Sequence, residues 1–148
     1  SDPPARVQAL RAQEGITITG EVPDIRPYLG RAAVSLCPMT IGGGVKHKIL
    51  QSLAMATPVV TNSLGATGLG LTPGENFLLA EGDEALAAAC ISLLNNPVRG
   101  REMGIAGREH IVHRHSWDRV AESLDVFQDL ALANWKDGSR TGVEITRK

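Results

Sequence analysis

The chain has 148 residues, of which 43% are hydrophobic and 21% charged, and its formal net charge is −1. This length suits one domain with a buried core, and the near-neutral charge argues against nucleic acid as a partner. No apolar run reaches the roughly 18 residues that a membrane-spanning helix needs. The two cysteines, Cys37 and Cys90, form no CxxC pair, which fits reduced thiols in a cytoplasmic protein.

The ends of the sequence suggest a piece of a longer protein. The chain has no initiating Met and no signal-peptide pattern, and a helix-like segment begins directly after Pro3 and Pro4. We assign residues 1–133 to one domain. We expect residues 134–148, a polar tail, to be loosely held.

The first third of the chain predicts two helices and two strands. Arg6–Gln13 follows two prolines and is expected to be helical, and the alternating Ile16–Thr19 to be a strand. Val22–Ala32 predicts a short helix entered through Asp24. The apolar run Ala33–Pro38 predicts a second strand, which leads into a glycine-rich loop.

The middle of the chain predicts a helix followed by two more strands. The apolar residues of Lys46–Ala56 recur at helical spacing: Ile49, Leu50, Leu53 and Ala54. Pro58–Asn62 is rich in β-branched residues and predicts a third strand, buried on both faces. A glycine-rich loop over Ser63–Gly74 then leads into a fourth strand at Asn76–Ala80.

The last part of the chain predicts three helices, entered through Asp83, Pro97 and Ser116. The inner face of the first is expected to hold Leu86, Ala89 or Cys90, and Leu93. The inner face of the second is expected to hold Met103, Ala106, His110 and Ile111. The apolar stripe of the third consists of Trp117, Val120, Leu124, Phe127 and Ala131.

This alternation predicts an α/β fold, with a parallel sheet covered by helices on both faces and ligands at the carboxyl ends of its strands. The loop after Cys37 is therefore the main candidate site. Its glycines (Gly42, Gly43 and Gly44) allow close backbone approach, and the next helix offers unpaired amides to an anion. Lys46 and Lys48 add charges that suit a diphosphate. Neither standard phosphate motif fits, so these residues alone leave open a plain connecting loop.

The stretch GGGVKHKILQSLAMATPVV, residues 42–60, resembles the donor-site signature of the group 1 retaining glycosyltransferases of GT-B fold. Members of that family commonly read G-[SG]-G-x-[RK]-x-K-[IVL]-L-E-A-M-A-x-G-x-P-V-V. Three flanking segments are similar to segments that occur in the same order in family members: ITITGEVPDIRPYLGRAAVSLCP, NSLGATGL and REMGIAGREHIVHRHSW. The resemblance spans residues 5–130.

The resemblance implies that residues 1–133 are part of the Rossmann-like, donor-binding C-terminal half of such an enzyme, without its first strands. It implies transfer of a sugar from a nucleotide diphosphate sugar to an unknown acceptor, with no cofactor and no metal. The implied donor-binding residues are Gly42, Gly43, Gly44, Val45, Lys46, Lys48 and Gln51. The catalytic residues stay unknown, and His110, His113 and His115 are not expected to converge on a metal.

The sequence departs from the family at Gln51, where members carry a Glu that faces the ribose hydroxyls. A carboxamide has only one acceptor oxygen, so we expect weaker ribose binding. The pair Ala56-Thr57 also replaces the usual small residue and glycine. Two alternatives stay open: a related sugar-nucleotide enzyme such as an epimerase, and a non-catalytic module that binds a nucleotide or partner, which Gln51 favours.

The resemblance also makes Ile16–Thr19 the third strand and Ala33–Pro38 the fourth of a doubly wound sheet of order 3-2-1-4-5-6. The two absent strands would lie between them and leave an unpaired edge. We therefore expect the isolated chain to self-associate and to be inactive. Any peripheral membrane contact is expected to come from the missing N-terminal domain.

Overall fold

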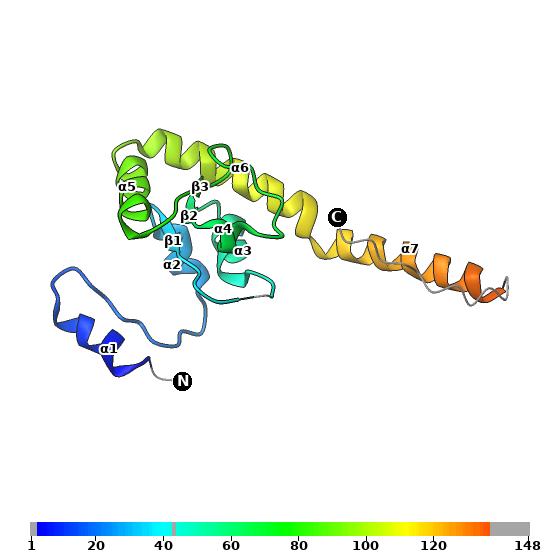
Figure 1. Ribbon diagram of the computed structural model, residues 1–148, viewed down its shortest axis with the longest axis horizontal. Coiled ribbons are helices and arrows are strands. Elements are labelled where there is room, and N and C mark those ends of the chain that lie inside the picture. Colours follow the sequence, from blue (N-terminus) through cyan, green and yellow to red (C-terminus); the bar gives the residue numbers. More distant parts are fainter. Residues whose placement is uncertain (1–2, 43, 137–148) are drawn as a thin grey trace.

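The computed structural model describes residues 3–42 and 44–136. Three parallel strands form its sheet, and helices surround them (Figure 1). The elements are α1 (Ala5–Gln8), the 3-10 helix η1 (Ala9–Ala12), α2 (Arg26–Arg31), β1 (Ser35–Cys37), α3 (His47–Ala54), β2 (Val59–Thr61), α4 (Ser63–Ala66), β3 (Leu78–Leu79), α5 (Asp83–Leu94), α6 (Pro97–His115) and α7 (Trp117–Lys136).

The sheet has the spatial order β1-β2-β3, with β2 in the centre. Ser35 lies opposite Val59, and Thr61 lies opposite Leu79. All three residues of β2 are 0% exposed, which confirms the prediction that this β-branched strand is buried on both faces. In the described part of the chain, β1 has no strand on its outer side. Self-association through that edge stays a prediction.

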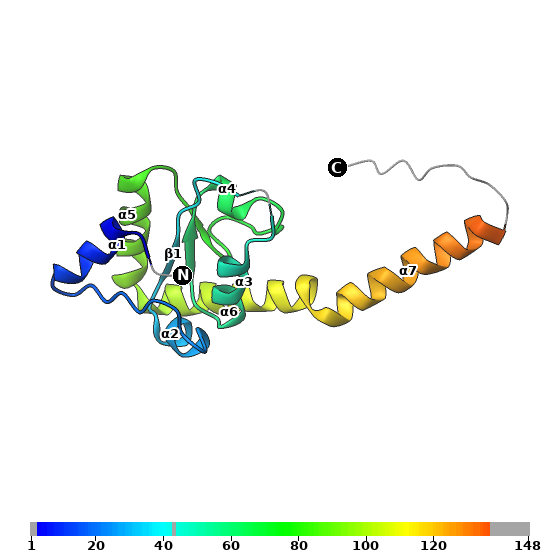
Figure 2. The ribbon, with the colours of Figure 1, turned by 90° about the horizontal axis from the view of Figure 1, so that it is seen from below.

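Two core clusters lie on opposite faces of the sheet, because successive strand residues point in opposite directions. One cluster joins Val59 of β2 to residues of α3, α6 and the loops near β3: Ile49, Leu53, Leu69, Phe77 and Ile111. The other joins Val60 of β2 to α5 and α6: Leu86, Leu93 and Met103. Helix α6 therefore contributes to both clusters, and it runs below the sheet in Figure 2. The predicted parallel sheet with helices on both faces is confirmed.

Glycines let α6 approach the segment between α3 and β2 closely. A Cβ atom added to Gly104 would lie 2.0 Å from the Ala56 carbonyl oxygen, and one added to Gly107 would lie 2.6 Å from Leu53 Cδ2. The Arg108 guanidinium donates to the Ala54 carbonyl at the end of α3. The contact thus depends on small residues, with an arginine satisfying one orphan carbonyl of α3.

Ala56, two residues after the end of α3, has a left-handed backbone conformation, with φ of +57°. Its amide donates to the Leu53 carbonyl over 2.9 Å, and the Thr57 amide donates to the Ser52 carbonyl over 3.0 Å. These two bonds form a Schellman motif, whose left-handed residue is usually glycine. A side chain at this position carries a steric cost that glycine avoids.

We predict that Ala56→Gly raises the free energy of unfolding by about 1 kcal/mol, because relief of this strain exceeds the entropy that glycine gains in the unfolded chain. Urea unfolding of the full chain measures the change. Ala54→Gly, inside α3, is the matched control and should lower stability by about 1 kcal/mol. Equal destabilisation by both changes would contradict the strain at Ala56.

Three local expectations were wrong. Ile16–Thr19 is not a strand; it has no neighbouring strand to pair with among the described residues, and Ile16 is 39% exposed. The predicted loop Ser63–Gly74 begins with helix α4, whose N-cap Asn62 accepts a hydrogen bond from the Gly65 amide. Asp83 is the first residue of α5 rather than its cap, a place held by Gly82.

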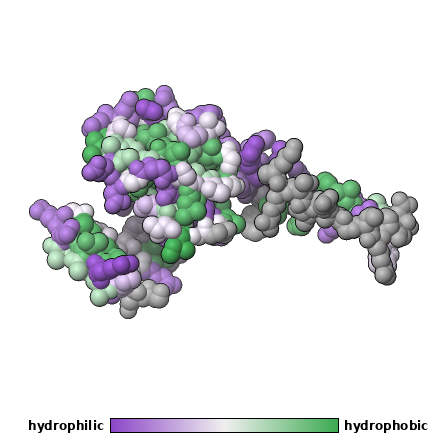
Figure 3. All heavy atoms as spheres, in the orientation of Figure 1, coloured by the Kyte–Doolittle hydropathy of each residue, from purple (hydrophilic) through white to green (hydrophobic). Residues whose placement is uncertain are grey.

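Helix α7 extends away from the sheet and its helices (Figure 1). Ser116 ends α6 with an extended backbone, φ −70° and ψ 154°, and this redirects the chain. The expected apolar stripe lies at the surface: Val120 is 43%, Leu124 55% and Phe127 66% exposed. Figure 3 shows hydrophobic atoms, in green, at the surface of the extended part of the molecule. The stripe was predicted correctly as a helix face, but α7 does not pack it on the sheet. The Trp117 side chain and residues 137–148 lie outside the described structure.

Cys37 and Cys90 are both free thiols and both partly buried. Burial raises the pKa of the Cys90 thiol above its ordinary value. In residues 3–42 and 44–136, no helix is long and apolar enough to cross a bilayer.

Candidate functional site

The candidate site lies where β1 ends and α3 begins. The connecting loop turns at Gly42, whose φ of +147° favours glycine, and Gly44 faces open space. Gly43 lies outside the described residues. The exposed side chains of Ile41 and Val45 flank the glycines, at 86% and 66% exposure. The loop therefore presents backbone to solvent between two apolar side chains.

The structure separates the two predicted lysines. Lys46, the N-cap of α3, is only 7% exposed, and its ammonium group donates to the Gly42 carbonyl across the loop. Lys48 is exposed on the first turn of α3. Among the described residues, no carboxylate forms an ion pair with either lysine. Lys46 therefore points into the loop, and Lys48 points toward solvent.

Lys48 and Gln51 are neighbours on the exposed face of α3, because they are three residues apart on a helix. The opposite face is buried and holds Ile49, Ser52 and Leu53. At the start of α3, the His47 amide donates to the Val45 carbonyl and the Ile49 amide donates to the Lys46 carbonyl, each over 3.0 Å. The expectation that this helix start offers unpaired amides is therefore wrong for these two groups. The Lys48 and Gln51 side chains form one polar surface beside the glycine loop. An anion could accept hydrogen bonds from it.

Asn62, at the carboxyl end of β2, fixes the start of the glycine loop. Its side-chain amide donates to the Met39 carbonyl over 2.7 Å, and its oxygen accepts from the Met39 amide over 3.3 Å. The same oxygen accepts from the Gly65 amide over 3.1 Å. The sequence analysis missed this residue. An Asn directly before a short helix is nevertheless a capping signal, and it could have been recognised.

The third strand end adds a carboxylate to the same edge of the sheet. Glu81 follows β3 and accepts from the Ser63 hydroxyl over 2.5 Å and from the Ser63 amide over 2.7 Å. These two hydrogen bonds, the hydroxyl's first, lower the pKa of the Glu81 carboxyl below its ordinary value. Glu81 therefore ties the loop after β3 to the start of α4.

We predict that the hydrogen bonds between Glu81 and Ser63 stop stabilising the folded chain in acid. A lowered folded-state pKa means that the stabilisation is complete above the unfolded-state pKa, near 4.5, and disappears as the pH falls through the folded-state pKa. The stability difference between the natural chain and Glu81→Gln should therefore be largest at neutral pH and shrink below about pH 4.5. Urea unfolding at several pH values measures it. Glu75→Gln, a change at another exposed carboxylate, is the control, and an equal pH trend there would contradict the assignment.

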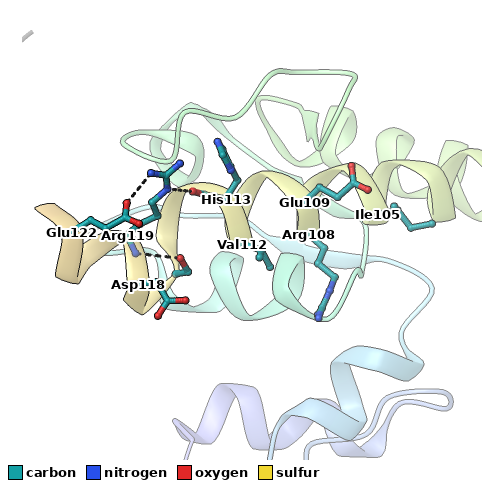
Figure 4. Close-up of a pocket in the computed structure, with 9 residues that line it drawn as sticks. Ile105, Arg108, Glu109, Val112, His113, Asp118, Arg119 and Glu122 are labelled. Carbon is teal, nitrogen blue, oxygen red and sulfur yellow. Dashed lines mark hydrogen bonds and ion pairs between the residues drawn. The ribbon is translucent and has the colours of Figure 1, made fainter.

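The described residues also form an open hollow of about 880 Å³ at the junction of α6 and α7 (Figure 4). Its lining mixes charges of both signs, and Arg119 donates there to the His113 carbonyl and to Glu122. None of the predicted donor-binding residues lines it. The hollow is therefore separate from the glycine loop.

His110 of α6 has a structural contact. The His110 ring nitrogen Nε2 lies 3.0 Å from the Leu69 carbonyl and holds the loop before β3. Within the described ranges, no group of three or more His, Cys, Asp or Glu side chains could hold a metal ion.

Comparison with known proteins adds independent evidence. The family described as "Glycosyl transferases group 1" matches residues 1–96, which include the glycine loop, α3 and β2. The chain is 34% identical over 117 residues to an alpha-maltose-1-phosphate synthase of Mycolicibacterium smegmatis, covering 72% of this chain and 30% of the relative. It is 30% identical over 111 residues to a GDP-mannose-dependent monoacylated alpha-(1-6)-phosphatidylinositol monomannoside mannosyltransferase of Corynebacterium glutamicum, covering 70% and 29%.

Among solved structures, the sucrose-phosphate synthase from Thermosynechococcus elongatus superimposes with a TM-score of 0.73 and 25% identity, covering 86% of this chain and 33% of that one. The chain thus spans a third or less of the length of these relatives. Its parallel sheet and helices match the GT-B sucrose-phosphate synthase structure. The chain belongs to the group 1 family of glycosyl transferases.

Proposed function

We propose that this chain is the donor-binding part of a glycosyltransferase, which transfers a sugar from a nucleotide diphosphate sugar to an acceptor. The observation that carries the proposal is the exposed glycine loop, which leaves the carboxyl end of β1 and enters α3. Ligands of open parallel sheets bind at this end of the strands. The name of the C. glutamicum relative, a GDP-mannose-dependent mannosyltransferase, supports a donor of this chemical class.

The loop offers three kinds of contact to a diphosphate. Gly42 and Gly44 permit close backbone approach, and the positive end of the α3 dipole favours an anion. Lys48 adds a mobile charge on the same surface. Gln51 is exposed on the same face of α3, and we assign to it the contact with the hydroxyl groups of a ribose.

In this proposal, residues 1–133 belong to the donor-binding unit. Helix α7 continues past this predicted boundary to Lys136, and residues 137–148 of the predicted tail lie outside the described residues. The acceptor is expected to bind a part of the enzyme that corresponds to the remaining length of the relatives. The chain alone should therefore bind a donor without transferring its sugar. Its two free thiols fit a cytoplasmic location.

A second candidate is a module that binds a nucleotide without catalysis, and Gln51 is the observation that favours it. Calorimetric titration of the full-length protein with a nucleotide diphosphate sugar, with and without acceptors, distinguishes the two. Release of free nucleoside diphosphate only when an acceptor is present supports the transferase. Tight binding without release under every condition supports the module, and absence of binding overturns both.

We predict that Gln51→Glu leaves unchanged or raises the affinity for a ribonucleoside diphosphate, whereas Gln51→Leu lowers that affinity about tenfold. A carboxylate accepts hydrogen bonds from both ribose hydroxyls, and leucine accepts none. The measurement is the dissociation constant by calorimetry. A 2′-deoxy nucleotide is the matched control ligand and should reduce the difference between the variants. An affinity indifferent to both changes would mean that Gln51 does not meet the ribose.

A further inference from the structure

We propose that Lys46 is a positioning residue: its buried ammonium group holds the Gly42 carbonyl and fixes the turn at Gly42, beside which Lys48 is offered to the diphosphate. The inference deepens the proposed function and rests on it for the identity of the ligand. The two lysines look equivalent in the sequence, but they then have different roles: Lys46 positions the turn, and Lys48 contacts the ligand.

Burial is the first argument. Lys46 is 7% exposed, although lysine is almost never buried without a partner. Its partner in the described chain is a backbone carbonyl, that of Gly42, four residues earlier. A hydrogen bond from an ionised donor is stronger than a neutral one, and the surrounding protein screens it less than water would. Lys46 therefore links the turn at Gly42 to the start of α3.

The conformation of Gly42 is the second argument. Its φ of +147° is strained for residues other than glycine. A Cβ atom at this position would lie 3.3 Å from Met39 Cε and 3.4 Å from Lys46 Nζ. The turn is thus packed between the two side chains, and the ammonium group occupies one wall of it.

The attachment at the start of the loop is the third argument. Asn62 bonds both the amide and the carbonyl of Met39, three residues before the turn. The loop is therefore tied to β2 at Met39 and to the start of α3 at Gly42. A loop held at two points loses less conformational entropy when it binds a ligand, and this raises affinity without any contact to the ligand.

Amine labelling tests the position of Lys46 without any nucleotide. The full chain is treated with a brief pulse of an acetylating reagent, and the modification of each lysine is measured by peptide mass spectrometry. We expect Lys46 to react at least about tenfold more slowly than Lys48, because its reaction requires the hydrogen bond to Gly42 to open. Equal reactivity of the two lysines overturns the proposal.

A pair of variants separates positioning from direct contact. Backbone ¹⁵N relaxation of the nucleotide-free chain should report order parameters of Gly42 and Gly44 below about 0.6 in Lys46→Met, compared with about 0.85 for rigid backbone. Lys48→Met, the matched control, should leave them unchanged. Lys46→Arg, which keeps the charge and a donor, should restore the loop. Unchanged amide signals of β2 show that each variant is folded.

Affinity completes the test. With a nucleoside diphosphate that the natural chain binds, Lys46→Met and Lys48→Met should each weaken binding about tenfold or more, and Lys46→Arg should restore most of it. Weaker binding by Lys46→Met with an unchanged loop would make Lys46 a direct ligand and overturn the inference. If the natural chain binds no nucleoside diphosphate but the loop loosens in Lys46→Met, the proposed function fails while the positioning role is supported.

Discussion

Replacing Gly104 by Ala should lower the free energy of unfolding by about 2 kcal/mol or more. The added Cβ would lie 2.0 Å from the Ala56 carbonyl oxygen, 2.8 Å from the Ala56 carbonyl carbon and 3.3 Å from the Pro58 nitrogen. All three are backbone atoms, so a helix or the start of β2 must shift, at a cost of about 3 kcal/mol. The better helix propensity of alanine offsets about 1 kcal/mol of this.

Gly100→Ala is the matched control for this change. It lies on the same buried face of α6, but its added Cβ would come no closer than 3.7 Å, to Pro58 Cγ, which is an ordinary contact. This variant should be as stable as the natural chain or more stable. Urea unfolding with an unchanged m-value measures both. Equal stability of the two variants would contradict the close packing of α6 on the segment between α3 and β2.

Replacing Lys46 and Lys48 together by Ala should weaken the binding of a nucleoside diphosphate roughly a hundredfold or more. Each lysine is expected to contribute about 1.5–3 kcal/mol, Lys48 through a charge-assisted contact and Lys46 through the loop. Two such losses correspond to at least this factor in the dissociation constant. Calorimetry or fluorescence titration of the folded variant measures it.

The control for the lysine pair is Arg99→Ala with Arg101→Ala, which removes two exposed charges from α6. This variant should bind as the natural chain does, apart from a small general effect of net charge. A folded lysine variant with unchanged affinity would show that the diphosphate does not lie at the glycine loop. A similar loss of affinity in both variants would show that the loss comes from the change in net charge.

Sequence patterns predicted the elements whose own residues indicate how they are buried. The β-branched run of β2 required burial on both faces, and the spacing of Leu86 and Leu93 defined the inner face of α5. Ile16–Thr19 has the same kind of pattern, but a strand exists only with a hydrogen-bonded neighbour, which its own residues do not specify. The exposed stripe of α7 is a similar case, because periodicity predicts a helix face but not what covers it.

The candidate site was predictable in its position but not in the tasks of its residues. Glycines after an apolar strand and before a helix are a local signal, and the structure places that loop at the carboxyl end of β1. Lys46 and Lys48 carry the same charge two residues apart, so sequence could not tell that the turn at Gly42 would bury one and expose the other. Asn62 contacts Met39 across 23 positions of sequence, a pairing that only the sheet produces.

The central claim is that the loop between β1 and α3 binds the diphosphate of a nucleotide sugar. Titration of the ¹⁵N-labelled full chain with uridine, guanosine and adenosine diphosphates, followed by amide chemical shifts, tests it most directly. The account predicts saturable shifts for at least one of them, concentrated at Gly42, Gly44, Lys48 and Gln51. No saturable shift up to about 1 mM nucleotide, or shifts confined to the hollow between α6 and α7, would contradict it.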